Sequence, residues 1–580
     1  MEFDQLLTQL PQYQELIKKL TPQSRQLVTG ISGSATTLLM ASTFQSQQKS
    51  MVVVVDTLFH AEQLVSDLTN LVNEDQVSLF PVEEMPAAEL ATSSPDFRAQ
   101  RVRALHQLQS APANIVVTTI SGIRRLLPTP EQFQASAINL EIGSDIEIAD
   151  LKLKLHQMGG YSPEKMVAAP GGEFSIRGSI VDVYPLNSEY PVRIDFFDTE
   201  VDSMRIFDSA DQRSIENIET VNILPATDLL MTDEQRQITA EQVTKELEKQ
   251  TAAMKQADQA ELLNDNLKPQ LADLMAGLND SKWLLFSQWL YPEKTSLLDY
   301  LPADGVTWFD DYGRLQETNR QLAVDQGNWL ADQQIDQRVL AKTEYTNDFT
   351  TVFKADQHAQ LIIALFQKGL GQMKLSAIVE MTTRPMQQFF SQMPLLKTEV
   401  GRWRKQKQTV VILVAEQLRV QKVAKTLADF EIGVTQTDLE NILPATVQIV
   451  PGQLQSGFEI PSAKLAVVTE KELFGQVTKK RPPQRQTFNN AERIKSYSDL
   501  KPGDYVVHVN HGIGRYEGMK TMEVDGKHQD YLTITYRDNA QLFIPVTQLN
   551  LIQKYVAGND KRPTINKLGG AASGLRPSKK

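Results

Sequence analysis

The sequence predicts a multidomain α/β protein, and three observations support this fold class. Short apolar segments such as residues 51–55 and 115–118 alternate with segments whose apolar residues recur at helical spacing, the pattern of a parallel sheet covered by helices. Strand-like segments separated by turn residues fill residues 173–205 and predict an antiparallel β unit inserted into that α/β domain. At about 100–200 residues per domain, 580 residues suffice for roughly three to five domains.

The composition excludes several classes of protein. The chain has 71 Asp and Glu against 59 Lys and Arg, a net charge of −12, seven histidines and no cysteine. The lack of cysteine rules out disulfide frameworks and thiolate metal sites, and the scattered histidines predict no metal centre. No apolar segment approaches the ~20 residues of a membrane span. We therefore expect a cytoplasmic protein that does not contact a membrane and that contacts DNA only weakly or indirectly.

The order of the elements predicts the division into domains. A first α/β domain takes up residues 1–130, with strands at 26–28, 51–55 and 115–118 and helices at 35–42, 60–72 and 121–127. The inserted β unit takes up residues 131–222. Residues 223–354 return to the first domain, with a helical segment at 233–278 and strands at 283–286 and 306–309. A second, small α/β domain is predicted for residues 355–476, with strands at 409–414, 447–450 and 464–468.

The rest of the chain is predicted to hold a linker, a β module and a tail. Residues 477–496 are hydrophilic and rich in basic residues, which is typical of a linker. Residues 497–558 form a compact β module with strands at 505–509, 513–519, 531–537 and 541–546, and Asp525-Gly526 predicts a two-residue hairpin turn. The tail, residues 559–580, is basic.

A glycine-rich turn at residues 30–37 follows a predicted strand and precedes a predicted helix. In phosphate-binding loops, backbone N–H groups and the helix N-terminus hold the phosphates, and a lysine balances their charge. Here Ala35 and Thr36 stand where that pattern has glycine and lysine, and the nearest carboxylates for magnesium are Asp310 and Asp311. We expect a vestigial phosphate loop and no catalytic residue; the residues of the loop are Gly30, Gly33, Ser34, Ala35, Thr36 and Thr37.

Two arginines of the inserted β unit are candidates for a binding patch. The run 172–185 places Arg177 beside a glycine at an open surface, and the run 191–198 carries Arg193 and two adjacent phenylalanines that face opposite sides of a strand. Arginine next to an exposed aromatic ring is the composition of binding hot spots. The residues alone also allow a structural role, in which the phenylalanines fill a core and the arginines pair with Asp182, Asp195 or Asp198.

The same β unit resembles the module shared by UvrB and the bacterial transcription-repair coupling factors (Mfd). The strings that carry the resemblance are Gly-Glu-Phe at 172–174, Arg-Gly at 177–178, Tyr-Pro at 184–185, Phe-Phe-Asp at 196–198 and Arg-Ile-Phe-Asp at 205–208. In that family the module is an insert on a degenerate helicase-like fold, and it binds the damage-recognition protein UvrA. The resemblance implies that residues 1–130 and 223–354 form the helicase-like domain and that Arg177, Arg193 and Phe197 contact UvrA.

Two departures favour the coupling factors over UvrB. The lysine of the phosphate loop is replaced by Thr36, and residues 79–98 contain no tyrosine where UvrB has a tyrosine-rich hairpin that clamps DNA. An ATP-dependent UvrB-like helicase therefore remains only as an alternative. Another alternative is a CarD-type transcription regulator, which leaves residues 1–475 without a role.

The β module resembles the RNA-polymerase-interacting domain shared by the coupling factors and the CarD-type regulators, a small Tudor-like barrel. The resemblance rests on residues 504–519, 531–537 and 542–546. In that family the module packs against the polymerase β subunit through a strand edge. The implied contacts are Tyr505, Val507, His511, Arg515, Tyr516 and Met519, although the residues alone also allow Tyr516 a place in the core.

The chain contains no second phosphate loop. In the family, an ATP-dependent DNA translocase follows the β module, whereas residues 571–580 of this chain do not resemble the family. The resemblance therefore implies a truncated or partial sequence: a monomeric adaptor that links RNA polymerase to UvrA. We expect this chain to be no enzyme and to need no cofactor, because ATP and magnesium belong to the family's motor.

Overall fold

The computed structural model describes residues 2–84, 95–110, 112–158, 160–167, 172–277, 281–365, 373–475, 491–492, 501, 503–508, 512–524, 527–537, 540–545 and 552–555. The chain divides into two compact units. The first unit comprises Met1–Glu84 and Ser94–Gln484, and the second comprises Met85–Ser93 and Arg485–Lys580.

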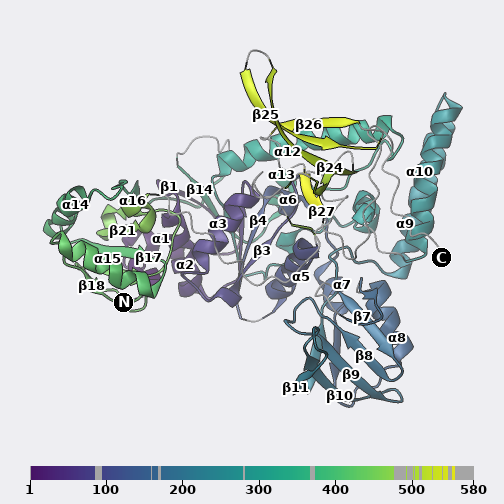
Figure 1. The fold of residues 1–580 in the computed structure, drawn as a ribbon, viewed down its shortest axis with the longest axis horizontal. Coiled ribbons are helices and arrows are strands. Elements are labelled where there is room, and N and C mark those ends of the chain that lie inside the picture. Colours follow the sequence, from purple (N-terminus) through teal and green to yellow (C-terminus); the bar gives the residue numbers. More distant parts are fainter. Residues whose placement is uncertain are drawn as a thin grey trace. The chain divides into compact units, whose positions relative to one another are not determined.

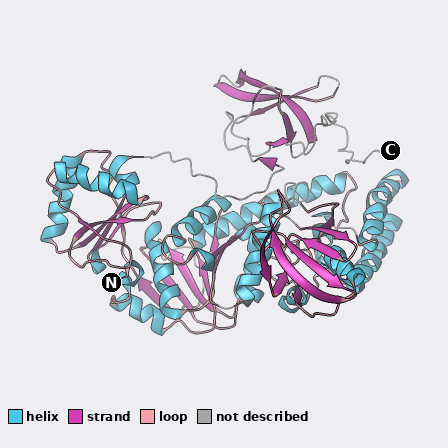
Figure 2. Cartoon of the chain, turned by 60° about the horizontal axis from the view of Figure 1, so that its bottom comes forward, coloured by secondary structure: helices cyan, strands magenta, loops and turns pink. Residues whose placement is uncertain are grey.

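A seven-stranded parallel sheet lies in the first unit (Figure 1) in the order β15-β1-β14-β13-β2-β4-β3. Its strands are β1 (Arg25–Thr29), β2 (Met51–Val55), β3 (Val77–Phe80), β4 (Ile115–Thr119), β13 (Val306–Phe309), β14 (Ala359–Ala364) and β15 (Ala377–Glu380). Every residue of β2, β4, β13 and β14 is buried, as expected for parallel strands covered on both faces. Figure 2 shows helices on both sides of this sheet. The predicted parallel α/β sheet is confirmed.

The first 355 residues contain helices at all four segments predicted to be helical and further helices that were not predicted. The helices are α1 (Pro11–Lys18), α2 (Ser34–Gln47), α3 (Leu58–Leu68), α5 (Pro95–Gln109), α6 (Ile120–Arg124), α7 (Pro130–Ala135), α8 (Ile148–Leu153), α9 (Asp233–Ala253), α10 (Ala257–Met275), α11 (Ser287–Leu290), α12 (Tyr312–Ile335) and α13 (Phe349–Ala355). The strand predicted at residues 283–286 is wrong, because this segment belongs to the 3-10 helix η4 (Ser281–Phe286). Its Trp283 is buried in one cluster with apolar residues of α9 and α10.

The inserted β unit forms a six-stranded sheet in the order β11-β10-β9-β8-β7-β6. Its strands are β6 (Ser162–Pro163), β7 (Glu173–Arg177), β8 (Ile180–Val183), β9 (Val192–Phe197), β10 (Glu200–Phe207) and β11 (Ser214–Ile218). All neighbouring strands are antiparallel except β6 and β7. A separate two-stranded ribbon joins β5 (Ile138–Glu141) to β12 (Thr220–Ile223). The antiparallel unit predicted from the sequence is therefore present.

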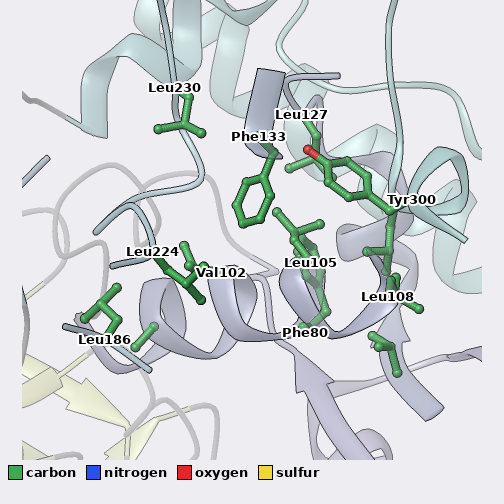
Figure 3. Packing of buried hydrophobic residues seen from close by; sticks show 14 of the residues in the cluster. Phe80, Val102, Leu105, Leu108, Leu127, Phe133, Leu186, Leu224, Leu230 and Tyr300 are labelled. Atoms are coloured by element: carbon green, nitrogen blue, oxygen red, sulfur yellow. The ribbon is translucent and has the colours of Figure 1, made fainter. Parts of the chain in front are cut away.

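An apolar cluster joins the β unit to the parallel sheet (Figure 3). Leu186 belongs to the inserted segment, Leu224 follows directly after it, and Val102 and Leu105 come from α5 of the α/β domain. Phe80, Leu108, Leu127, Phe133, Leu230 and Tyr300 complete the part of the cluster that the figure labels. Burial of these side chains fixes the β unit on its support.

A buried ion triad lies at the same junction. The Asp228 carboxylate is completely buried and accepts hydrogen bonds from Arg101 Nη2 at 3.0 Å and from Arg125 Nε at 2.5 Å. Burial opposes ionisation, but the charges of the two arginines outweigh it and hold the pKa of Asp228 far below its usual range. Arg101 also donates to the carbonyl of Pro81 at 3.1 Å. The triad thus connects α5 and the end of α6 with the segment that returns from the insert.

The small α/β domain carries a mixed sheet in the order β16-β20-β21-β17-β19-β18, whereas β14 and β15, which lie within the residues 355–476 predicted for this domain, belong to the seven-stranded sheet. Its elements are β16 (Arg384–Pro385), α14 (Met393–Lys405), β17 (Thr409–Val414), α15 (Gln417–Asp429), β18 (Thr435–Gln436), β19 (Val447–Pro451), β20 (Phe458–Ile460), β21 (Leu465–Thr469) and α16 (Glu470–Phe474). Leu413, Val450 and Phe458 of this domain share a buried cluster with Phe3 and Leu39 of the first domain. The two α/β domains therefore pack on a common core.

The second unit carries an antiparallel sheet in the order β22-β27-β23-β24-β25-β26. Its strands are β22 (Ala491–Glu492), β23 (Tyr505–His508), β24 (Gly512–Val524), β25 (Lys527–Thr535), β26 (Gln541–Pro545) and β27 (Ile552–Tyr555). Gly514 lies so close to β25 that a Cβ atom there would stand 2.5 Å from Ile534 Cγ2. The predicted turn Asp525-Gly526 lies outside the described residues, and Val524 pairs with Lys527 on either side of it. In the part of the chain that the structure describes, no helix is both long enough and apolar enough to cross a membrane.

A histidine before β14 predicts how stability changes with pH. His358 Nδ1 lies 2.6 Å from Asp356 Oδ1, and its Nε2 lies 3.2 Å from the carbonyl oxygen of Leu301. Since both neighbours accept hydrogen bonds, the doubly protonated ring can donate one hydrogen bond to each of them. Burial disfavours the charge, but the hydrogen bond to Asp356, the negative charge of Asp356 and the hydrogen bond to the Leu301 carbonyl together outweigh it, so the pKa of His358 is raised.

Replacing His358 by glutamine is therefore expected to lower stability most at low pH. The contribution of His358 is complete below the unfolded pKa of about 6.5 and is lost as the pH rises through the higher folded value. Urea denaturation of the two chains at a series of pH values measures this difference. His106→Gln is the matched control, because burial lowers the pKa of His106. A gap between wild type and His358→Gln that widens above pH ~6.5 would contradict the assignment.

Candidate functional sites

The loop predicted to be a vestigial phosphate loop, residues 30–37, connects β1 to α2 and lines a cavity of about 390 Å³. Gly30 and Gly33 have φ angles of 79° and 60°, the left-handed backbone that favours glycine. Thr36, which replaces the lysine, is buried and lines the same cavity. The predicted strand–turn–helix geometry is therefore present.

A carboxylate and a segment of the small α/β domain occupy the rim of this loop. The hydroxyl of Ser34 donates to Asp67 Oδ2 at 2.6 Å, and the backbone N–H of Ser456 donates to Ser34 Oγ at 3.1 Å. The backbone N–H of Gln455 donates to Asp67 Oδ1 at 2.9 Å. Asp67 and Ser456 lie 33 and 422 positions from Ser34, and no sequence pattern marked them. The loop thus serves as a contact between the two α/β domains.

The carboxylates considered for magnesium lie at the same edge of the sheet. Asp310 is half-buried beside His60, with Asp310 Oδ2 3.5 Å from Nε2, and Asp56 Oδ1 lies 2.8 Å from Nδ1 of the same ring. Burial raises the pKa of Asp310, which disfavours the ionised form that a cation needs. Among the residues that the structure describes, no cluster of three or more acidic or histidine side chains could hold a metal ion.

Restoring the missing lysine is expected to leave the loop without ATPase activity. In Thr36→Lys the positive charge returns, but the Asp67 carboxylate still lies 2.6 Å from the Ser34 hydroxyl and repels phosphate. Phosphate release from ATP should stay at background for the wild type, for Thr36→Lys and for the uncharged control Thr36→Met. Turnover gained by the lysine variant alone would show that the loop still accepts a nucleotide.

The arginines predicted to bind a partner lie on the outward face of the six-stranded sheet. In β9 the side chains of Val192, Ile194 and Phe196 are buried, and the alternate side chains face outward. Arg193 therefore lies on this face, opposite Asp182 of β8 in the strand register.

Arg177 and Arg193 share the Asp182 carboxylate, which is completely buried. Arg193 donates from Nε at 2.7 Å and from Nη2 at 3.0 Å, and Arg177 donates from Nη2. Arg193 also donates to Gln212 Oε1 at 3.1 Å and lies over the ring of Phe207. The sequence allowed three aspartate partners, and the structure selects Asp182 for both arginines. Gln212 was not among the residues predicted to contact a partner.

The three residues predicted to contact UvrA, Arg177, Arg193 and Phe197, differ in their exposure. The side chain of Arg193 is 14% exposed, that of Arg177 is 45% exposed, and Phe197 is 78% exposed. The neighbouring Phe196 is buried in the core, so the two phenylalanines face opposite sides as the strand period predicts. Phe197 and Arg177 are thus the accessible members of the set.

The candidate residues of the β module are divided between surface and core. Arg515 and Met519 of β24 are exposed, and Tyr505 of β23 is half-buried. Tyr516 is buried in a cluster with Val506, Leu532, Ile534 and Tyr536, which places it in the core. Val507 lies in β23 and pairs with Ile513 and Gln553, whereas His511 lies outside the described residues.

Two family models match the two parts of the chain that carry these residues. The model described as the UvrB interaction domain matches residues 138–229. The model described as the CarD-like/TRCF RID domain matches residues 500–556. The first match covers the β unit with Arg177, Arg193 and Phe197, and the second covers the β module.

Three curated relatives that match nearly the whole chain are transcription-repair-coupling factors. The transcription-repair-coupling factor of Bacillus subtilis (strain 168) is 39% identical over 547 residues, which are 94% of this chain and 46% of the relative. Those of Staphylococcus epidermidis (RP62A) and Staphylococcus haemolyticus (JCSC1435) are 34% and 33% identical over 96% and 94% of the chain. The chain spans about half the length of these curated relatives. Over nearly its whole length the chain is therefore similar to part of the transcription-repair-coupling factors, and it matches the models of the UvrB interaction domain and the CarD-like/TRCF RID domain.

Proposed function

We propose that this chain is the adaptor part of a transcription-coupled DNA repair factor. The β unit, residues 131–222, binds UvrA, and the β module, residues 497–558, binds RNA polymerase through its β subunit. The match of both family models to one chain carries this proposal. Matches to transcription-repair-coupling factors over 94% of the chain favour it over a CarD-type regulator, whose resemblance is limited to the β module.

The exposed residues of each module support this assignment. On the β unit, Arg177 offers a guanidinium and Phe197 an unburied ring, the side chains that dominate protein interfaces. On the β module, Arg515 and Met519 lie on β24 with their side chains exposed. Tyr516 is left out of the proposed polymerase contacts because it is buried.

We also infer that the chain itself hydrolyses no ATP and that its partners bind without a nucleotide. The support is the threonine at position 36 and the engagement of Ser34 by Asp67 and Ser456. This argues against a UvrB-like helicase, which needs a working phosphate loop.

Separate pull-downs with purified UvrA and with RNA polymerase, both without nucleotide, test the proposed function. The immobilised wild-type chain should retain each partner. Phe197→Ala should lower retention of UvrA and leave that of polymerase unchanged, and Arg515→Glu should do the reverse. Failure of the wild-type chain to retain either partner would overturn the proposal.

A further inference from the structure

Asp182 binds two arginines on the outward sheet face at once. Its carboxylate lies in β8, is completely buried, and accepts hydrogen bonds from Arg177 of β7 and Arg193 of β9. Arg193 has further partners in Gln212 and the ring of Phe207, whose centroid lies 4.3 Å from the guanidinium carbon. Arg193 is therefore held on three sides, and little of its surface is available to another molecule.

The network of Asp182, Arg177 and Arg193 carries one net positive charge. Two guanidinium groups share a single carboxylate, and the neighbouring Arg205 of β10 forms a separate pair with Asp195, at 2.5 Å. The surplus charge is presented by Arg177, because its side chain is about three times as exposed as that of Arg193 (45% against 14%).

An unburied phenyl ring stands near this charge. Arg177, Ile180 and Asp195 lie opposite one another across β7, β8 and β9, and Phe197 follows Asp195 by two positions on the same face. At about 4.8 Å between strands, Arg177 and Phe197 lie within reach of one partner surface. A carboxylate beside an apolar hollow is the complementary chemistry.

We propose that Asp182 is a positioning residue for partner binding and that Arg193 acts through it. Arg177 and Phe197 then make the direct contacts, to a partner surface that offers a carboxylate beside an apolar hollow. The inference rests on the proposed function, since it takes UvrA as the partner.

A double-mutant cycle on the whole chain tests this division of roles. Arg193→Gln is expected to weaken UvrA binding about tenfold in the presence of Asp182 and less than about twofold in the Asp182→Asn background, because its effect passes through Asp182. Phe197→Ala should weaken binding about tenfold in both backgrounds. Arg205→Gln, on the same face but in its own ion pair, is the matched control and should change binding less than about twofold.

A second experiment tests the inference without the Asp182→Asn variant, which could fail to fold. It measures how far UvrA protects each arginine of the wild-type chain from chemical modification. In the free wild-type chain, phenylglyoxal should modify Arg177 and spare Arg193, and added UvrA should protect Arg177. Arg193 that is reactive in the free chain and protected by UvrA would overturn the inference, as would equal effects of Arg193→Gln in both backgrounds. A wild-type chain that does not bind UvrA would overturn the proposed function, and the inference with it.

Discussion

Replacement of Asp228 by alanine is expected to destabilise the first unit by about 3–5 kcal/mol, because it removes the buried carboxylate that two buried guanidinium groups bind. The side chains of Arg101 and Arg125 are 1% and 3% exposed, and that of Asp228 is completely buried. Water therefore cannot take the place of the lost carboxylate. The midpoint of urea denaturation, followed by circular dichroism, measures the loss.

Glu317→Ala provides the matched control for this effect. Glu317 pairs with Arg320 on α12, and both side chains are 71% exposed. Exposed pairs contribute little, so the control should change stability by less than about 1 kcal/mol. If Asp228→Ala shifted the midpoint no more than Glu317→Ala, the triad would not be what holds the β unit to its support.

Combined replacement of Arg177 and Arg193 by alanine is expected to weaken UvrA binding at least about 100-fold, or by about 2.7 kcal/mol. The double variant removes the exposed guanidinium and also the residue that fixes the Asp182 carboxylate. Titration of the chain into UvrA by isothermal calorimetry measures the loss.

Lysine at both positions separates charge from shape in this experiment. Lysine keeps the positive charge but cannot form the two-pronged hydrogen bonds that Arg193 makes to Asp182. Binding by the lysine variant should lie between that of the wild type and that of the alanine variant. Affinity of the alanine variant equal to that of the wild type would refute the assignment of these residues, provided that both melt at the same temperature.

Local sequence patterns predicted most of the strands. They failed where packing between segments decides whether an apolar run forms a strand or a helical turn. The apolar runs that form β2 and β4 are continuous and β-branched, so their strands were correctly predicted. The run at residues 283–286 is also apolar, but its Trp-Leu-Leu-Phe sequence has no β-branched residue, and it folds as part of a 3-10 helix because a short apolar run suits a buried helical turn equally well. Burial of Trp283 in one cluster with α9 and α10, a contact between distant segments, decides the outcome.

At the candidate sites, too, the sequence predicted local features but not the contacts between distant segments. Alternation along β9 predicted that Phe196 and Phe197 face opposite sides, and the period of a strand is a local property. Which aspartate pairs with Arg193 depends on the register of β8 against β9, which the sequence left open among three residues. Asp67 and Ser456, which engage the phosphate loop, come from other elements and gave no signal.

Reconstitution with both partners tests the adaptor role most directly. Purified RNA polymerase, UvrA and this chain are mixed without nucleotide and separated by gel filtration. We predict that UvrA elutes with polymerase only when the chain is present, and that Arg177→Ala with Arg193→Ala keeps the chain on polymerase but releases UvrA. If UvrA never elutes with polymerase, or if polymerase displaces UvrA from the chain, the chain does not link the two.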